Sequence, residues 1–114
     1  MRQLDSLPLT PSQREALAEL RRSVSADFDV EGMVLFGSAA RGEADDESDL
    51  DVLILTKKPL ARPTRHRITD LIFDINLRHG TNLSSLVIDR ENWETGAASV
   101  LPIHDEILKD GVAV

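Results

Sequence analysis

A Gly-Ser pair and an Asp-x-Asp triplet constrain the fold of this chain more than any other feature. The pair Gly37-Ser38 ends one apolar run, and the triplet that begins at Asp49 and ends at Asp51 leads into the next, with ten residues between the two motifs. Short apolar runs bounded by turn residues are typical of buried strands. The pattern therefore predicts two strands joined by a polar loop, with one motif at each end of the loop.

The residue types in these motifs indicate a site for a cation and phosphates. A strand would place Asp49 and Asp51 on one face, about two 3.3 Å rises apart. Neighbouring carboxylates can share a hard cation such as Mg²⁺, and a turn formed by Gly37 and Ser38 can cradle the phosphates that the cation neutralises. Loop-end acids and an ordinary tight turn are the simpler alternatives. Two acids on one face repel each other unless a cation joins them, which favours the cation site.

Composition limits the class of protein. The chain has 114 residues, so we expect a single domain over 1–114. It has no cysteine, which excludes disulfides and thiolate metal sites. Because it has neither a long apolar run nor an apolar signal core at its start, we expect a cytoplasmic protein that does not bind a membrane. A formal net charge of −7 argues against extended nucleic-acid binding and suits a basic protein partner.

The remaining pattern predicts a small α/β domain. Thr10, Pro11 and Gln13 form a helix start with a capping box, and Gly80 is the expected C-cap of a later helix. We predict helices over 11–24, 64–79 and 100–110 and strands over 30–36, 50–56 and 83–88. We also predict a connection over 57–63 and a short strand or docked tail over 112–114.

Two further predictions concern the C-terminal part. In the last helix, Ile103, Ile107 and Leu108 are expected to point inward because their spacing follows a helical period. Trp93, the only tryptophan, is expected to anchor the tail on the sheet. Stacking of Trp93 on a nucleobase is the alternative.

The motif resembles that of the nucleotidyltransferase superfamily typified by DNA polymerase beta. More closely, it resembles the minimal nucleotidyltransferases of bacteria and archaea. Their pattern of Gly-Ser, ten residues and Asp-x-Asp stands here without a gap from Gly37 to Asp51, and Arg41 and Ser48 are further matches. The resemblance covers roughly residues 11–90. It implies the nucleotidyltransferase fold, a small mixed β-sheet with helices on one side.

The resemblance also implies roles for individual residues. Asp49 and Asp51 would be the catalytic metal ligands for Mg²⁺, and Gly37 and Ser38 would hold the triphosphate of ATP. Arg41 would either touch a phosphate or pair with an acid, namely Asp45, Asp46 or a motif aspartate. Both alternatives remain open at this point.

One departure from the family pattern concerns catalysis. Active members usually add a third carboxylate from a later strand, whereas that strand here carries Ser84 and Ser85. The nearest other acids in the sequence are Asp74 and Asp89. Loss of the third acid would weaken activation of the attacking hydroxyl.

The expected function follows from the resemblance. It implies transfer of a nucleoside monophosphate, AMP from ATP, to a protein acceptor. Such small proteins are often the antitoxin of a pair whose toxin is an all-helical HEPN ribonuclease. The alternative is a catalytically degenerate module that neutralises or scaffolds its partner by contact. Transfer to a small molecule is a third possibility, which we expect less because a single domain of this size has no separate domain to bind such an acceptor.

Overall fold

The first long helix begins at a capping box, as the sequence predicts. In the computed structural model, which describes residues 1–114, α1 spans Pro11–Asp27 and continues past the predicted end at residue 24. The Thr10 hydroxyl accepts a hydrogen bond from the Gln13 N–H, and the Gln13 side chain accepts one from the Thr10 N–H. The stripe predicted to face inward is fully buried and consists of Leu17, Leu20 and Val24.

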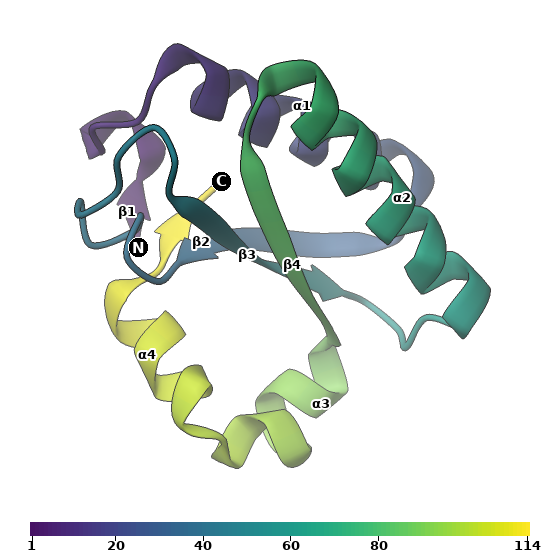
Figure 1. The fold of residues 1–114 in the computed structure, drawn as a ribbon. Coiled ribbons are helices and arrows are strands. Elements are labelled where there is room, and N and C mark those ends of the chain that lie inside the picture. The colour runs from purple at the N-terminus through teal and green to yellow at the C-terminus, as the bar shows by residue number, and fades with distance from the viewer.

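Five strands form one mixed sheet in the order β1-β5-β2-β3-β4 (Figure 1). Antiparallel pairing joins β2 to both β3 and β5, whereas β3 pairs with β4, and β1 with β5, in parallel. The three main strands and the strand at the C-terminal tail agree with prediction, while β1 was not predicted. The strands are β1 Arg2–Gln3, β2 Val30–Phe36, β3 Asp49–Thr56, β4 Asn82–Asp89 and β5 Val112–Ala113.

Helix α2 connects the parallel pair β3 and β4. It spans Arg62–His79, so the predicted connection over 57–63 is too long. Pro63 is accommodated in the first turn, where a missing N–H removes no helical hydrogen bond. The helix ends at Gly80, which has the left-handed φ of 66° expected of a C-cap.

Helices cover both faces of the sheet, so the expected arrangement with helices on one side is wrong. Figure 1 shows α1 and α2 on one side and α3 and α4 on the other. Alternation along β3 explains this, because Val52 and Ile54 pack in the cluster under α1 and α2, while Leu53 packs with Trp93 and Ile107. Trp93 therefore anchors the tail as predicted. The smaller helical elements are η1 Leu4–Ser6, α3 Arg90–Thr95 and η2 Ala97–Val100.

The last helix differs from prediction at its start and on its outer face. Helix α4 spans Pro102–Asp110, because proline at the first turn separates it from η2. Ile107 is buried as predicted, but Leu108 is 59% exposed, so its predicted inward orientation is wrong. No helix has both the length and the apolar character that crossing a lipid bilayer requires.

Candidate active site

The two motif aspartates lie at the start of β3, on the face opposite to α1 and α2. Asp49 is exposed and Asp51 is partly buried, whereas Leu50 between them is fully buried in the main core. Asp51 lies beside Phe36 of β2 and beside Ser84 of β4. The start of β3 thus presents both carboxylates on the face that has the smaller core cluster.

The electrostatics of this pair favour a bound cation. Burial raises the pKa of Asp51, and the nearby negative charge of Asp49 raises it further. No group of three or more histidine, cysteine, aspartate or glutamate side chains is arranged to hold a metal ion. A two-carboxylate donor set still fits Mg²⁺, because this ion is commonly held by one or two carboxylates together with substrate phosphates and water.

Gly37 brings the motif turn directly against Asp51. Its φ is +79°, in the left-handed region that favours glycine. A Cβ at this position would lie 2.7 Å from Oδ2 of Asp51, so a side chain here would force the Asp51 carboxylate to move. Gly37 is therefore needed both for the turn and for the contact between the turn and the carboxylate.

The turn that follows Gly37 offers unpaired hydrogen-bond donors. The carbonyl groups of Gly37, Ser38 and Ala39 accept bonds from the N–H groups of the three residues 41–43. The N–H and the hydroxyl of Ser38 form no hydrogen bond within the protein, and Ser38 is partly exposed, whereas Ala39 and Ala40 are buried in the main core. Free N–H groups at the start of such a turn can donate to phosphate oxygens.

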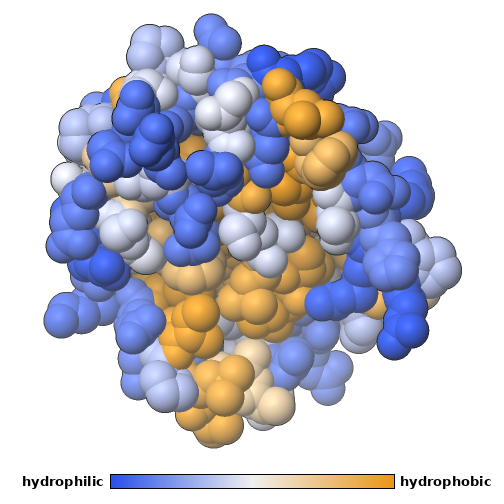
Figure 2. All heavy atoms as spheres, viewed as in Figure 1, coloured by the Kyte–Doolittle hydropathy of each residue, from blue (hydrophilic) through white to orange (hydrophobic).

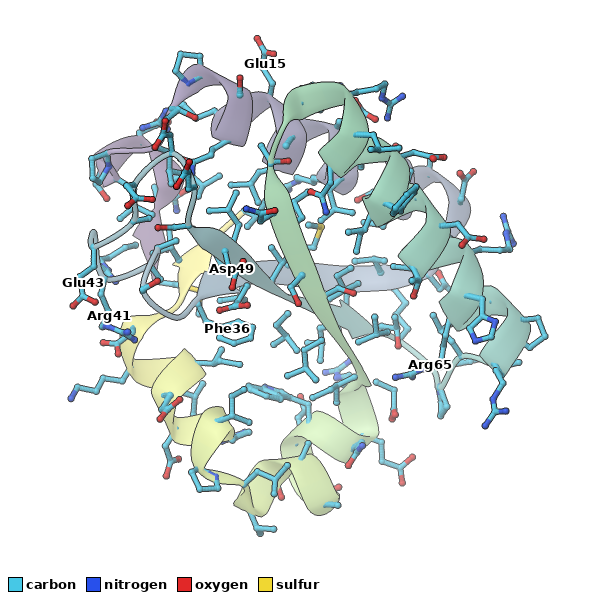
Figure 3. All side chains as sticks on the ribbon, viewed as in Figure 1. Glu15, Phe36, Arg41, Glu43, Asp49 and Arg65 are labelled. Atoms are coloured by element: carbon cyan, nitrogen blue, oxygen red, sulfur yellow. The ribbon has the colours of Figure 1, made fainter.

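Arg41 lies on the outer part of the same loop. Its Nε is 3.5 Å from Oε2 of Glu43, and both side chains are exposed. The prediction that Arg41 pairs with Asp45, Asp46 or a motif aspartate is therefore wrong. Figure 3 shows Arg41 and Glu43 together on the loop, with Asp49 nearer to Phe36. An exposed pair of this kind is weak, so Arg41 remains available to a phosphate.

The position expected for a third carboxylate is occupied by Ser84. In the parallel register Ser84 pairs with Asp51 and is exposed on the same face. Asp89 is at the opposite end of β4, where it accepts a hydrogen bond from the Asn92 N–H and caps α3. Asp74 belongs to α2, on the other side of the sheet. Neither acid substitutes for the missing one.

Two residues hold the loop in place, and the sequence analysis predicted this role for neither of them. The Gln13 side chain donates to the carbonyl of Asp45 at 2.8 Å, and the Asn82 side chain donates to the carbonyl of Glu47 at 3.1 Å. Asn82 also pairs with Asp49 in the sheet register. A prediction that β3 and β4 are parallel would have pointed to Asn82, whereas Gln13 was assigned only to the capping box.

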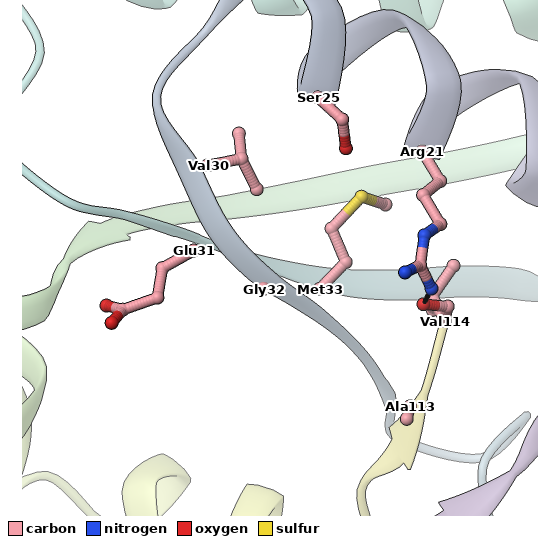
Figure 4. Close-up of a pocket in the computed structure, with 8 residues that line it drawn as sticks. All are labelled: Arg21, Ser25, Val30, Glu31, Gly32, Met33, Ala113 and Val114. Atoms are coloured by element: carbon pink, nitrogen blue, oxygen red, sulfur yellow. Dashed lines mark hydrogen bonds between the residues drawn. The ribbon is translucent and has the colours of Figure 1, made fainter.

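One cavity of about 330 Å³ lies elsewhere (Figure 4). It is formed between α1, the free edge of β2 and the C-terminal residues, and the Arg21 guanidinium there donates to the carbonyl of Val114. The cavity does not include either aspartate, so it is separate from the candidate site. Its lining residues are Arg21, Ser25, Val30, Glu31, Gly32, Met33, Ala113 and Val114.

Solved structures with the same fold support this architecture. A "putative minimal nucleotidyltransferase" superposes with a TM-score of 0.62 at 18% identity, over 90% of this chain and 93% of its own. A "putative nucleotidyltransferase" from Sulfolobus solfataricus gives 0.56 at 22% identity, over 95% and 90%. A toxin-antitoxin solved with AMP-PNP gives 0.59 at 14% identity, over 91% and 72%. At these identities the similarity establishes the α+β fold.

Sequence comparison adds the family. Two proteins of Methanocaldococcus jannaschii, both named "putative protein adenylyltransferase", are 36% and 31% identical to this chain over 63 and 75 residues. These matches cover 54% and 64% of this chain, and 43% and 76% of the relatives, so the chain spans less than half of the first relative's length. The family model named "Nucleotidyltransferase domain" matches residues 17–98, a range that contains both motifs. The chain therefore belongs to the nucleotidyltransferase domain family.

Proposed function

We propose that this protein transfers AMP from ATP to a protein acceptor. We also propose that it is the antitoxin of a toxin-antitoxin pair whose toxin is a HEPN protein. The observation that supports the proposal is the closeness of Gly37 to the Asp51 carboxylate, which brings the Gly37-Ser38 turn against one of the two acids. The names of the two archaeal relatives agree with a protein acceptor. The toxin-antitoxin among the structures with this fold agrees with a protein partner.

Two pairs of residues would bind the metal ion and the nucleotide. Asp49 and Asp51 would hold Mg²⁺, which supplies charge neutralisation and polarises the reacting phosphate when it is bound. Gly37 allows close approach of the triphosphate, and Ser38 offers its hydroxyl and its N–H as donors. Together these groups would orient the α-phosphate toward the open side of the sheet.

The transfer itself is a displacement at phosphorus. The acceptor hydroxyl forms a bond to the α-phosphorus, the bond to the β-phosphate oxygen breaks, and pyrophosphate leaves with the electron pair. The hydroxyl proton must leave as well. Ser84 stands where a third carboxylate could take that proton, and a serine is not an effective base, so we expect the proton to pass to solvent and the reaction to be slow.

The serine at position 84, in place of a third carboxylate, also supports a second candidate function. A nucleotidyltransferase domain with Ser84 beside Asp51 could serve as a binding module that neutralises its partner by contact, without transfer. Both candidates require a partner protein. They differ in whether the two aspartates are needed for the effect on that partner.

Calorimetry tests the metal-nucleotide site first. Wild-type protein should bind ATP more tightly with Mg²⁺ than without it, and the doubly substituted Asp49→Asn, Asp51→Asn protein should lose this difference. The double variant Asp46→Asn, Glu47→Gln is the matched control, because it also removes two charges, from exposed loop positions outside β3. Equal ATP affinity in all variants, with and without Mg²⁺, would exclude the assignment.

Incubation with labelled ATP and the protein encoded by the adjacent gene then separates the two candidates. Transfer of label that disappears in Asp49→Asn supports the enzyme. A stable complex without transfer, unaffected by Asp49→Asn, supports the binding module. Labelling of a small hydroxylated metabolite instead of the protein would contradict both.

A further inference from the structure

Exposed apolar side chains that do not pack in either core cluster lie at the start of α4, just before it, and on its outer face. Leu101 is the N-cap residue of α4, and Leu108 lies within the helix, seven positions later and about two turns along. They are 49% and 59% exposed, and Val100 just before them is 82% exposed. Ile103 and Ile107 on the opposite face of α4 pack in the smaller core cluster. We call Val100, Leu101 and Leu108 the α4 patch.

The α4 patch lies on the same side of the sheet as the two carboxylates. Helix α4 packs against β2, and Gly111 at its end approaches Val34 of that strand. Figure 2 shows apolar side chains running from the middle of this view to its lower edge, where Figure 1 places η2 and the start of α4. A protein docked on the α4 patch would therefore stand beside the open part of the candidate active site.

Acidic residues outnumber basic residues around the α4 patch. The segment 90–110 contains five acidic and two basic residues, and thus contributes −3 of the formal net charge of −7. Arg90, one of the two basic residues, is already paired with Glu31 and Glu94. Asp105, which lies between Leu101 and Leu108 on the helix, has a side chain that is 91% exposed. An apolar stripe with acidic surroundings complements a basic amphipathic segment.

We infer that the α4 patch is the docking surface for the partner protein, and that the partner presents a basic amphipathic helix to it. Leucine-sized side chains of that helix would cover Leu101 and Leu108, and its lysine or arginine side chains would pair with the exposed acids. The surface is a poor match for a lipid membrane, because anionic headgroups would be repelled. The inference depends on the proposed function only in identifying the docked protein as the acceptor.

The protein contains its own reporter for this docking. Trp93, the only tryptophan, is buried beneath α4, with its ring 4.2 Å from that of His104. A ligand that settles on α4 should therefore change the emission of Trp93. The probe is a synthetic helix-forming peptide without tryptophan that has leucines on one face and lysines on both flanks. A second peptide has glutamate in place of every lysine.

The expected result is saturable binding of the lysine peptide and binding at least tenfold weaker for the glutamate peptide. The double variant Leu101→Ser, Leu108→Ser should bind the lysine peptide at least tenfold more weakly than wild type. The matched control is Phe73→Ser, Leu77→Ser, which removes two somewhat more exposed apolar side chains from α2, across the sheet, and should bind as wild type does. Circular dichroism checks that both variants are folded.

Several outcomes would overturn the inference. These are no binding of the lysine peptide, equal binding of the two peptides, or a loss of binding in the α2 variant instead of the α4 variant. Sedimentation that reveals a self-associated form abolished by Leu101→Ser would assign the α4 patch to a second copy of the chain instead. Affinity for Mg²⁺ and ATP, measured on the same variants, should not change. If wild type lacks that affinity but binds the peptide, the proposed function fails and the docking surface stands.

Discussion

The two faces of the sheet differ in how completely they are covered, and the candidate site lies on the less covered one. Under α1 and α2 a single cluster of 18 buried residues runs from Leu7 to Val112. Under α3 and α4 the buried cluster has five members, among them Leu53 and Trp93. Since apolar burial is the main stabilising term in folding, most of the stability should come from the first face.

The less covered face has room for polar chemistry for the same reason. On β3, Leu53 is buried by α3 and α4, while Asp51 and Asp49 toward the strand start are progressively more exposed. A carboxylate pair could not stay charged in the larger cluster, where burial without a partner is costly. The helices α3 and α4 thus cover one end of this face and leave the other end accessible to a nucleotide.

The largest expected effect compares two isoleucines on opposite faces. Ile54 is fully buried under α1 and α2, and Ile88 is buried in the smaller cluster. We expect Ile54→Ala to cost about 4 kcal/mol and Ile88→Ala about 2 kcal/mol, because a loosely covered site relaxes around the cavity more easily. Urea unfolding measures both values. Equal losses would mean that the two faces contribute alike.

A smaller effect on stability, with a large effect on binding, is expected at Gly37. Gly37→Val should cost about 2 kcal/mol through its positive φ and should abolish ATP binding, because the new side chain would displace the Asp51 carboxylate. Gly42→Val is the control, since Gly42 has a φ of +77° but open space around its Cβ position. It should suffer the strain and keep ATP binding. Retention of ATP affinity in folded Gly37→Val would mean that the turn is only structural.

Restoring the third acid should raise the transfer rate moderately. Ser84→Asp puts a carboxylate beside Asp51 on the open face, and a positioned base should accelerate transfer at least about tenfold. Ser84→Asn is the control of equal size without charge, and it should not accelerate the reaction. Labelled ATP and the partner protein provide the assay. If the two variants react at the same rate, a base at this position is not what limits transfer.

The sequence was sufficient to predict the elements that depend on local patterns. Strand β2, the capping box at Thr10 and the C-cap at Gly80 follow from short-range chemistry, and all three are confirmed. The motif spacing also predicted that Asp49 and Asp51 share a face of β3. The roles of these two residues in binding metal and nucleotide stay predictions.

What the sequence did not predict depends on contacts between distant segments. The two-residue strand β1 exists only because it pairs with β5, near the other end of the chain. Leu108 fits a helical period for burial, yet it is 59% exposed, because α4 turns the face of Ile103 and Ile107 toward the smaller core cluster. Arg41 pairs with Glu43 because of the path that the loop takes, and residue types alone do not specify that path.

The smallest expected effect concerns the stability of the open face itself. The pKa of Asp51 is raised in the folded protein, first by burial and then by the charge of Asp49. The folded state therefore holds this proton more tightly than the unfolded state does. The resulting stabilisation is fully present below the ordinary aspartate pKa and is lost as pH rises through the higher folded value. At neutral pH the charged carboxylate should thus reduce stability.

Asp51→Asn should consequently be more stable than wild type at pH 7 in the absence of divalent cations. Because solvent screens a partly exposed pair, we expect a gain of only about 0.5 kcal/mol. The gain should vanish below about pH 4, where the wild-type carboxyl is protonated. It should also shrink in Mg²⁺, because a bound cation would stabilise wild type alone. Thermal unfolding across this pH range, with Asp46→Asn as the control, measures the difference. Lower stability of Asp51→Asn at neutral pH would mean that the carboxylate makes a stabilising contact, and that the open face is held together by its charges.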